Sequence, residues 1–152
     1  MAKRSSERSF NVNKMKKRFL EWRDIDDAVE RLATNVINSG KQISCIKGIA
    51  RGGLIPAVML SHKLGIPFLS EDDIDEEDGY LLIVDDICDS GVTLQQYDEF
   101  KDNILTATLH YKNSAITEPD FWWRLASEDE WIVYPWERKD SKTIQDYATK
   151  GE

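Results

Sequence analysis

Cysteine, histidine and long apolar segments are all scarce in this chain of 152 residues. The two cysteines, Cys45 and Cys88, form no C-x-x-C pair, and the two histidines are His62 and His110. This set disfavours both a zinc site and a disulfide framework. No run of 18 apolar residues exists, and the first residues lack the apolar stretch of a signal peptide. We therefore expect a cytoplasmic protein without a membrane span.

The charge is divided unevenly along the chain. Residues 1–18 hold seven Lys or Arg and one Glu, whereas residues 19–152 hold 13 basic and 27 acidic residues, and the net charge is −8. The excess of acidic residues in residues 19–152 disfavours binding to nucleic acid, which is itself negatively charged. We expect residues 1–18 to be a basic, disordered tail, although such a tail could also contact an anionic partner. Residues 19–152 have the length of a single domain.

The apolar pattern alternates between short buried strands and helices. Four apolar segments have strand length, namely residues 43–50, 66–69, 80–84 and 104–111. Three segments with helical spacing are residues 24–40, 54–64 and 92–101. Continuously apolar strands separated by helices predict an α/β fold, a Rossmann-like and mainly parallel sheet with helices on both faces.

Two loops follow predicted strands where a parallel sheet binds its ligands. One runs from Ala50 to Gly53, and the other runs from Asp85 to Thr93. In the second loop, Gly91 permits a close backbone approach, and the amides and hydroxyls of residues 90–93 suit a phosphate at a helix start. Asp85 and Asp86 would be repelled by that phosphate and suit sugar hydroxyls and a hydrated Mg²⁺. The loop as a whole thus suits a ribose 5-phosphate, whereas an acidic turn that merely caps a helix would not explain the two carboxylates.

Aromatic residues gather near the end of the chain, with Phe121, two tryptophans after it, Trp131, Tyr134 and Trp136 within 16 residues. Such a cluster either closes the edge of a core or offers flat surfaces on which a planar ligand stacks. Composition alone favours core packing.

Three segments in order resemble the type I phosphoribosyltransferase family, purine branch. They are IKGIARGGLIPAVMLSHKLGIPFL, LLIVDDICDSGVTL and EWIVYPWE, and the resemblance runs from about Phe19 to Glu137. The second is similar to the family's signature, and all three resemble the small xanthine-guanine and hypoxanthine enzymes. The resemblance implies the type I phosphoribosyltransferase fold. It also implies Mg²⁺-dependent transfer of ribose 5-phosphate from phosphoribosyl pyrophosphate to a 6-oxopurine in purine salvage, by a homo-oligomer.

The resemblance also implies roles for individual residues. Arg51 and Gly52 match the loop that holds the departing pyrophosphate, and Asp85 and Asp86 match the pair at the ribose hydroxyls and the metal. Asp89 matches the acid that manages the proton on purine N7, so that Asp89 and Arg51 are the expected catalytic residues. The remaining matches are the 5-phosphate loop of Ser90, Gly91, Val92 and Thr93, the 6-oxo reader Lys112, the base-stacking Trp131, and Ile132, whose backbone lies near the purine 2-position.

Other polar residues receive structural interpretations. Without the resemblance, Lys112 would be read as a solvated lysine at a strand end and Trp131 as a core indole. Cys88 lies inside the signature but is interpreted as a small packing residue. His62 and His110 are interpreted as ordinary helix and strand residues.

The sequence departs from the family between the strands expected at 66–69 and 80–84. Members have a long mobile segment there that covers the ribosyl centre, whereas this chain has only Ser70 to Gly79, with seven acidic residues. A missing cover would slow transfer or admit hydrolysis. Two functions therefore stay open: a minimal purine phosphoribosyltransferase, or a nucleotide-binding or regulatory module of that fold with little turnover.

Overall fold

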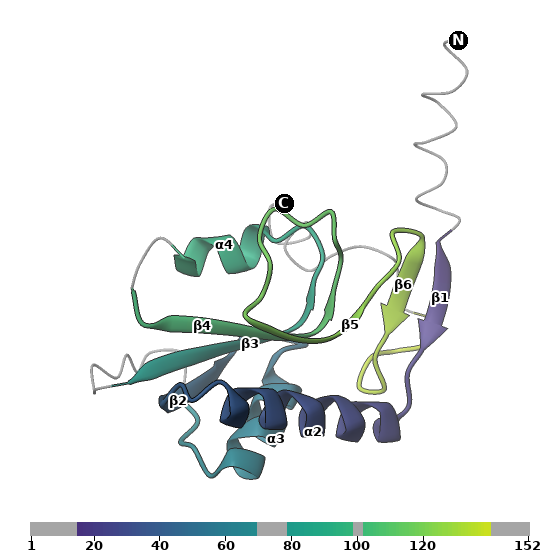
Figure 1. Ribbon diagram of the computed structural model, residues 1–152. Helices are drawn as coiled ribbons and strands as arrows, with labels where there is room; N and C mark the ends of the chain where they lie inside the picture. The colour runs from purple at the N-terminus through teal and green to yellow at the C-terminus, as the bar shows by residue number, and fades with distance from the viewer. Residues whose placement is uncertain (1–14, 70–78, 99–101, 141–152) are drawn as a thin grey trace. The chain divides into compact units, whose positions relative to one another are not determined.

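The computed structural model describes residues 15–69, 79–98 and 102–140 (Figure 1). These residues form two compact units, one of residues 23–126 and one that combines residues 15–22 with 127–140. The segment 19–152, expected to be a single domain, therefore contributes to both units. The two units are described in turn.

The larger unit is built on a four-stranded sheet. Its strands are β2 (Ile43–Gly48), β3 (Tyr80–Cys88), β4 (Ile104–Tyr111) and β5 (Phe121–Leu125). They are arranged in the order β2-β3-β4-β5, and every neighbouring pair is parallel. This arrangement confirms the predicted parallel sheet and places the carboxyl ends of all four strands at one edge.

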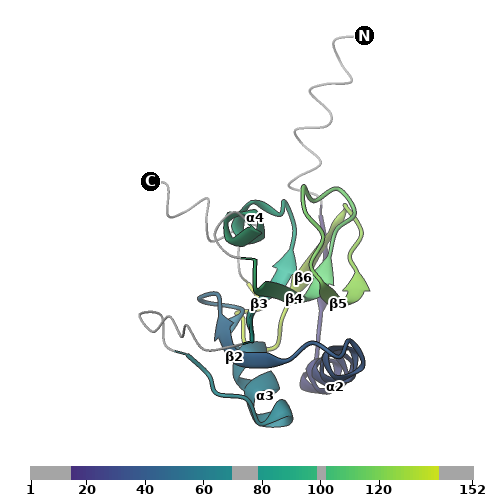
Figure 2. The ribbon, with the colours of Figure 1, turned by 60° about the vertical axis from the view of Figure 1, so that its left-hand side comes forward.

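Helices cover both faces of this sheet, as predicted. Helices α2 (Trp22–Asn38) and α3 (Leu54–Leu64) lie on one face, and α4 (Val92–Asp98) lies on the other (Figures 1 and 2). Helix α2 buries Ile25, Ala28, Val29, Leu32, Ala33 and Val36. Because these residues recur every three or four positions, one side of α2 is apolar and its burial against the sheet stabilises the helix.

The strand bounds differ from the prediction at three places, and the first is β2, which ends at Gly48 instead of residue 50. Strand β3 continues through the two acids to Cys88 instead of ending at Val84, because β4 is long enough to pair with Asp85 and Ile87. The expected strand at 66–69 is reduced to a single bridge between Phe68 and Ile46. Helix α4 ends at Asp98 within the described residues, and residues 99–101 of its predicted length lie outside them.

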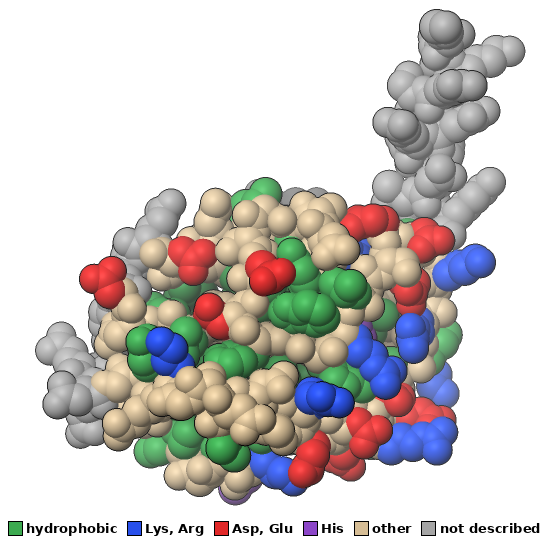
Figure 3. Space-filling view, viewed as in Figure 1, with side chains coloured by type: hydrophobic (Ala, Val, Ile, Leu, Met, Phe, Trp, Pro, Cys, Tyr) green, Lys and Arg blue, Asp and Glu red, His purple; other side chains and the backbone are tan. Residues whose placement is uncertain are grey.

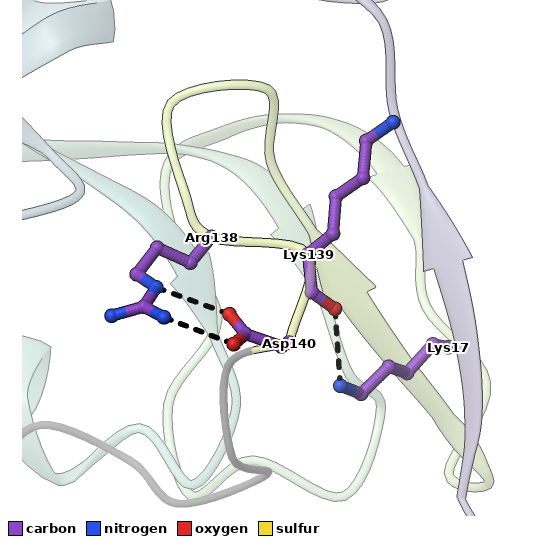
Figure 4. Close-up of polar contacts among 4 residues, drawn as sticks. All are labelled: Lys17, Arg138, Lys139 and Asp140. Atoms are coloured by element: carbon purple, nitrogen blue, oxygen red, sulfur yellow. Dashed lines mark hydrogen bonds and ion pairs between the residues drawn. The ribbon is translucent and has the colours of Figure 1, made fainter.

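The smaller unit contains a second, two-stranded parallel sheet. Strand β1 (Lys16–Phe19) pairs with β6 (Glu130–Val133). The Lys17 ammonium donates to the Lys139 carbonyl at 3.3 Å, and Arg138 holds both oxygens of Asp140 at 3.1 and 3.0 Å (Figure 4).

The expected tail of residues 1–18 is too long, because its last three residues are part of β1, where strand pairing orders them. Residues 1–14 lie outside the described residues.

The aromatic residues near the end of the chain are shared between the two units. In the larger unit, Trp122 packs against a core cluster of Ile83, Cys88, Leu94 and Tyr111. In the smaller unit, Trp136 stacks on Tyr134 with ring centroids 4.9 Å apart and an interplanar angle of 2°. For Trp122 and Tyr134, the structure thus supports core packing, the alternative that composition favoured.

The described surface mixes charges of both signs. On the face seen in Figure 3, acidic and basic side chains are interspersed with apolar ones. Among residues 15–69, 79–98 and 102–140, no helix is both long and apolar enough to cross a membrane.

The turn between β2 and α3 lies directly on the end of β3. The Ile49 amide donates to the Val84 carbonyl at 2.9 Å, and the Gly53 amide donates to the Ile49 carbonyl at 2.9 Å. A Cβ atom at Gly53 would overlap the Val84 carbonyl oxygen and lie 2.8 Å from the Cα of Asp85. Only glycine therefore lets this turn approach the strand so closely.

This packing predicts that Gly53→Ala destabilises the fold. All the atoms that the new methyl group would meet belong to the backbone, so we expect the free energy of unfolding to fall by about 3 kcal/mol, the upper part of the usual overpacking range. Gly65→Ala, at the other end of α3, is the matched control because no atom lies within 4 Å of its Cβ position. Its cost should be about 1 kcal/mol, from its left-handed φ of 66°. Urea unfolding measures both, and equal losses would contradict the close-packing explanation.

Candidate functional site

Three connecting segments meet at the carboxyl edge of the four-stranded sheet. They follow β2, β3 and β4 and comprise residues 49–53, 89–91 and 112–117. Because the three strands are parallel neighbours, their ends bring these segments together. The candidate site of the larger unit is described from these segments.

The first segment places Gly52 against the carboxylate of Asp86. A Cβ atom at Gly52 would overlap the Asp86 carboxylate, so a side chain at this position would displace it. The peptide bond between Ala50 and Arg51 is cis, and the Arg51 side chain is exposed. The structure thus brings the arginine-bearing turn next to the acidic end of β3, as the sequence predicts.

Asp85 and Asp86 are half-buried residues in the last part of β3. The Asp86 amide donates to Asp85 Oδ1 at 2.9 Å, and the Ile87 amide donates to Asp86 Oδ1 at 2.7 Å. Such amide bonds stabilise the charged form of a carboxylate and fix its direction. Both carboxylates are therefore fixed in direction by backbone amides.

Two adjacent carboxylates match what Mg²⁺ requires from a protein. This ion commonly binds one or two carboxylates, keeps several waters and takes its other ligands from substrate phosphates. Within the described ranges, no cluster of three or more His, Cys, Asp or Glu residues could hold a metal by itself. Asp85 and Asp86 thus offer the type of ligand that a Mg²⁺ ion completed by substrate oxygens would take, and they do not form a closed structural site.

Asp89 and Lys112 form an ion pair across the ends of β3 and β4. Lys112 Nζ lies 3.4 Å from Asp89 Oδ1, and the Lys112 side chain is 4% exposed. The Lys112 amide donates to the Cys88 carbonyl at 3.0 Å, which fixes the start of the third segment beside the second. A lysine this buried is not a solvated strand-end residue, so the structure contradicts that alternative.

The segment that leads into α4 turns at Gly91. Gly91 has a φ of 86°, and a Cβ there would lie 3.0 Å from the amide nitrogens of Ile116 and Thr117. The Ser90 hydroxyl accepts from the Val92 amide at 3.3 Å, and the first helical bond runs from the Gln95 amide to the Gly91 carbonyl. The amides of the first turn have no acceptor within the helix, which makes this turn locally electropositive.

Cys88 is a buried packing residue, as interpreted from the sequence. Its thiol donates to the Thr117 carbonyl at 3.4 Å, and its side chain belongs to the core cluster of Ile83, Leu94 and Tyr111. Burial, with smaller contributions from the charges of Asp85 and Asp89, raises the pKa of the Cys88 thiol to about 12. The neutral thiol therefore persists throughout the ordinary pH range.

The two histidines are not among the residues of the candidate site. His110 is buried in β4, where its ring meets the edge of Trp123 at a centroid distance of 5.5 Å. His62 is exposed on α3. Both positions agree with their interpretation as ordinary helix and strand residues.

Trp131 and Ile132 belong to the smaller unit, where they are neighbours in β6. Within the part of the chain that the structure describes, the indole nitrogens of Trp131 and Trp136 are buried without a hydrogen-bond partner. The predicted contacts of Trp131 and Ile132 with a purine remain predictions.

Sequence reasoning missed residues 113–117. The Ile116 amide donates to the Ser90 carbonyl at 2.9 Å, so this segment braces the predicted phosphate loop. The only signal in the sequence was Gly91, because a glycine in such a turn often marks a close approach by another backbone. The sequence gave no indication of which backbone that would be.

Comparison with known proteins finds relatives and solved structures named as purine phosphoribosyltransferases. No family model matches the chain. A xanthine-guanine phosphoribosyltransferase from Cereibacter sphaeroides is 30% identical over 113 residues, which are 60% of this chain and 68% of the relative. The corresponding enzyme from Idiomarina loihiensis is 27% identical over 139 residues, covering 78% of this chain and 86% of the relative. The crystal structure of a purine phosphoribosyltransferase from Pyrococcus horikoshii matches with a TM-score of 0.71 and 33% identity, covering 84% of this chain and 99% of that one.

The raised pKa of Cys88 predicts an unreactive thiol. In a Cys45→Ala variant, Cys88 is the only thiol, and we expect iodoacetamide at pH 8 to leave it unmodified in the native protein because its thiolate is scarce. In urea the same thiol should react fully, with its ordinary pKa near 9.0 restored. Mass spectrometry counts the modified molecules. Rapid alkylation of the native protein would contradict the burial of this thiol.

The same shift has a defined effect on stability. Between pH 9.0 and about 12 the unfolded thiol loses its proton while the folded thiol keeps it, so this group makes stability fall as the pH rises through that window.

Proposed function

The chain belongs to the purine phosphoribosyltransferase family, and from that membership we propose how its residues perform the reaction. The enzyme transfers the ribose 5-phosphate group from phosphoribosyl pyrophosphate to a purine and releases pyrophosphate. We propose that the acceptor is a 6-oxopurine, namely guanine, xanthine or hypoxanthine.

The observation that carries this choice of acceptor is the Lys112–Asp89 ion pair. In a 6-oxopurine, the 6-oxygen and N7 are adjacent on one edge of the ring. The Lys112 ammonium and the Asp89 carboxylate lie 3.4 Å apart, so both can face that one edge. Lys112 would donate to the 6-oxygen, and Asp89 would accept or return the proton at N7. Adenine has a donor at position 6, which leaves the lysine without an acceptor.

The end of β3 is proposed to bind the ribose, and the turn at Gly91 is proposed to bind the 5-phosphate. The carboxylates of Asp85 and Asp86 accept hydrogen bonds from the ribose hydroxyls. Ser90, Gly91, Val92 and Thr93 offer amides and hydroxyls to the 5-phosphate, and Gly91 has the conformation that lets its backbone approach closely. Hydrogen-bond acceptors for the ribose hydroxyls thus come first along this segment, and donors for the 5-phosphate follow them.

Arg51 and Gly52 are proposed to hold the departing pyrophosphate. Departure leaves an oxocarbenium-like sugar, so the site must stabilise negative charge on the leaving group and exclude a competing nucleophile. Arg51 supplies a positive charge, and Gly52 lets the turn lie against Asp86. A magnesium ion held by Asp85 and Asp86 would add Lewis-acid charge beside the pyrophosphate.

Three further expectations remain part of this proposal. Trp131 would stack on the base, with the Ile132 backbone near the 2-position. The protein would act as a homo-oligomer. The shortened acidic connection at Ser70 to Gly79 lies almost wholly outside the described residues, so its effect on hydrolysis is tested only by assay.

We expect purified protein with phosphoribosyl pyrophosphate and Mg²⁺ to convert 6-oxopurines into nucleotides. Asp89→Asn should lower this rate by about 10²- to 10⁴-fold, the usual range for a general acid or base. Asp27→Asn, an exposed change of the same kind on α2, is the control and should keep the full rate. Chromatography separates nucleotide from free ribose 5-phosphate. Tight nucleotide binding without turnover would instead favour a regulatory module.

Base selection is tested by Lys112→Met. The variant loses the donor to the 6-oxygen, so the preference of kcat/KM for hypoxanthine over adenine should disappear, because a site built to donate rejects a base that cannot accept. The matched control is Lys63→Met, which breaks the exposed ion pair with Glu30 and should keep the preference. An unchanged preference in Lys112→Met would show that another group reads position 6.

A further inference from the structure

The segment after β4 is bonded at both of its ends to the last residue of β3 and the segment that follows it. At its start, Lys112 pairs with Asp89 and its amide bonds to the Cys88 carbonyl. At its far end, the Ile116 amide donates to the Ser90 carbonyl at 2.9 Å, and the amides of Ile116 and Thr117 cover Gly91.

Thr117 makes two further contacts at that far end. Its hydroxyl donates to Asp98 Oδ2 at 3.2 Å, at the last residue of α4. Its carbonyl accepts from the Cys88 thiol at 3.4 Å, at the last residue of β3. Thr117 therefore joins the two ends of the stretch that contains the proposed phosphate loop, residues 88 and 98.

We propose that Thr117 is a positioning residue that fixes the distance between the purine-reading Lys112 and the phosphate loop. This inference rests on the proposed function of those two parts. Thr117 touches neither substrate in this scheme, and it acts through the bonds of its hydroxyl and carbonyl. Its hydroxyl holds the segment to the last residue of α4, whereas Ile116 uses its backbone amide to hold the Ser90 carbonyl.

The physical consequence concerns ligands that occupy both parts at once. A nucleoside monophosphate has its base and its phosphate joined, so it binds well only when the two parts are already at the matching separation. A ligand that fills one part alone does not depend on that separation. Loosening the Thr117 contact should therefore weaken the spanning ligand and spare the two fragments.

The test compares three ligands by calorimetry on the full chain. Thr117→Val keeps the shape of the side chain and removes the hydroxyl. We expect its Kd for guanosine 5′-monophosphate to rise about tenfold, well within what a small misplacement costs, while its Kd values for guanine and ribose 5-phosphate stay within about twofold of wild type. In turnover, kcat should fall while the KM for each substrate changes little. Thr117→Ser keeps the hydroxyl and should restore both.

Two further variants keep the test decisive. Thr34→Val removes a hydroxyl that donates to the Glu30 carbonyl on the exposed side of α2, and it should leave all three Kd values unchanged. Asp98→Ala removes the acceptor of the Thr117 hydroxyl, so it should raise the Kd for the nucleotide as Thr117→Val does. The double variant should have the same Kd as either single variant.

Three results would overturn the inference. An equal loss of ribose 5-phosphate and nucleotide binding in Thr117→Val would mean that Thr117 only stabilises the phosphate loop. Unchanged nucleotide binding in both Thr117→Val and Asp98→Ala would mean that the contact positions nothing. Failure of the wild-type protein to bind the nucleotide would overturn the proposed function itself, and this outcome is distinct because it needs no variant.

Discussion

The structure of the site depends on backbone segments that approach one another more closely than side chains would allow. The turn after β2 touches the end of β3 at Gly52 and Gly53, and the turn before α4 touches residues 116 and 117 at Gly91. A methyl group would meet backbone atoms at Gly53 and Gly91 and would displace the Asp86 carboxylate at Gly52. The parallel sheet brings the three segments to one edge, but only these glycines let them meet.

Charge is the second constraint on this edge of the sheet. Asp85, Asp86 and Asp89 lie within five residues, and the reaction needs two polyanionic groups to bind beside them. Arg51 and Lys112 supply two positive charges, which cannot balance three carboxylates and a pyrophosphate together. Because of this excess negative charge, a divalent cation suits the site. The proposed phosphate loop relies on backbone amides, which are neutral overall but present partially positive N–H groups.

The fold could be predicted from the sequence because its signals are local. The apolar spacing of α2 and the continuous apolar runs of β3 and β4 are properties of short segments, and the structure confirms them. The end of β3 could not be predicted, because Asp85 and Asp86 are poor strand residues that are held in the sheet by the length of β4. Tertiary pairing overrode local preference there.

The sequence could name candidate site residues but could not predict how they are arranged. Residue types at Arg51, Asp85 and Lys112 resemble a known family, but nothing in the sequence indicated that Lys112 is buried or paired with Asp89. That pairing needs two strand ends to be neighbours, which only the sheet order β2-β3-β4-β5 provides. For the same reason the contacts of Thr117 with Asp98 and Cys88 could not be predicted, since they join residues 19 and 29 positions apart.

The neutral thiol of Cys88 completes this electrostatic balance. A thiolate here would add a fourth negative charge between Asp85 and Asp89, at the point where the sugar phosphate is proposed to bind. Burial in the cluster with Leu94 and Tyr111 disfavours that charge, and the two neighbouring carboxylates disfavour it further. The core beneath the site therefore keeps the Cys88 thiol neutral even at pH values above its ordinary pKa of 9.0, so this strand end gains no further negative charge in alkaline solution.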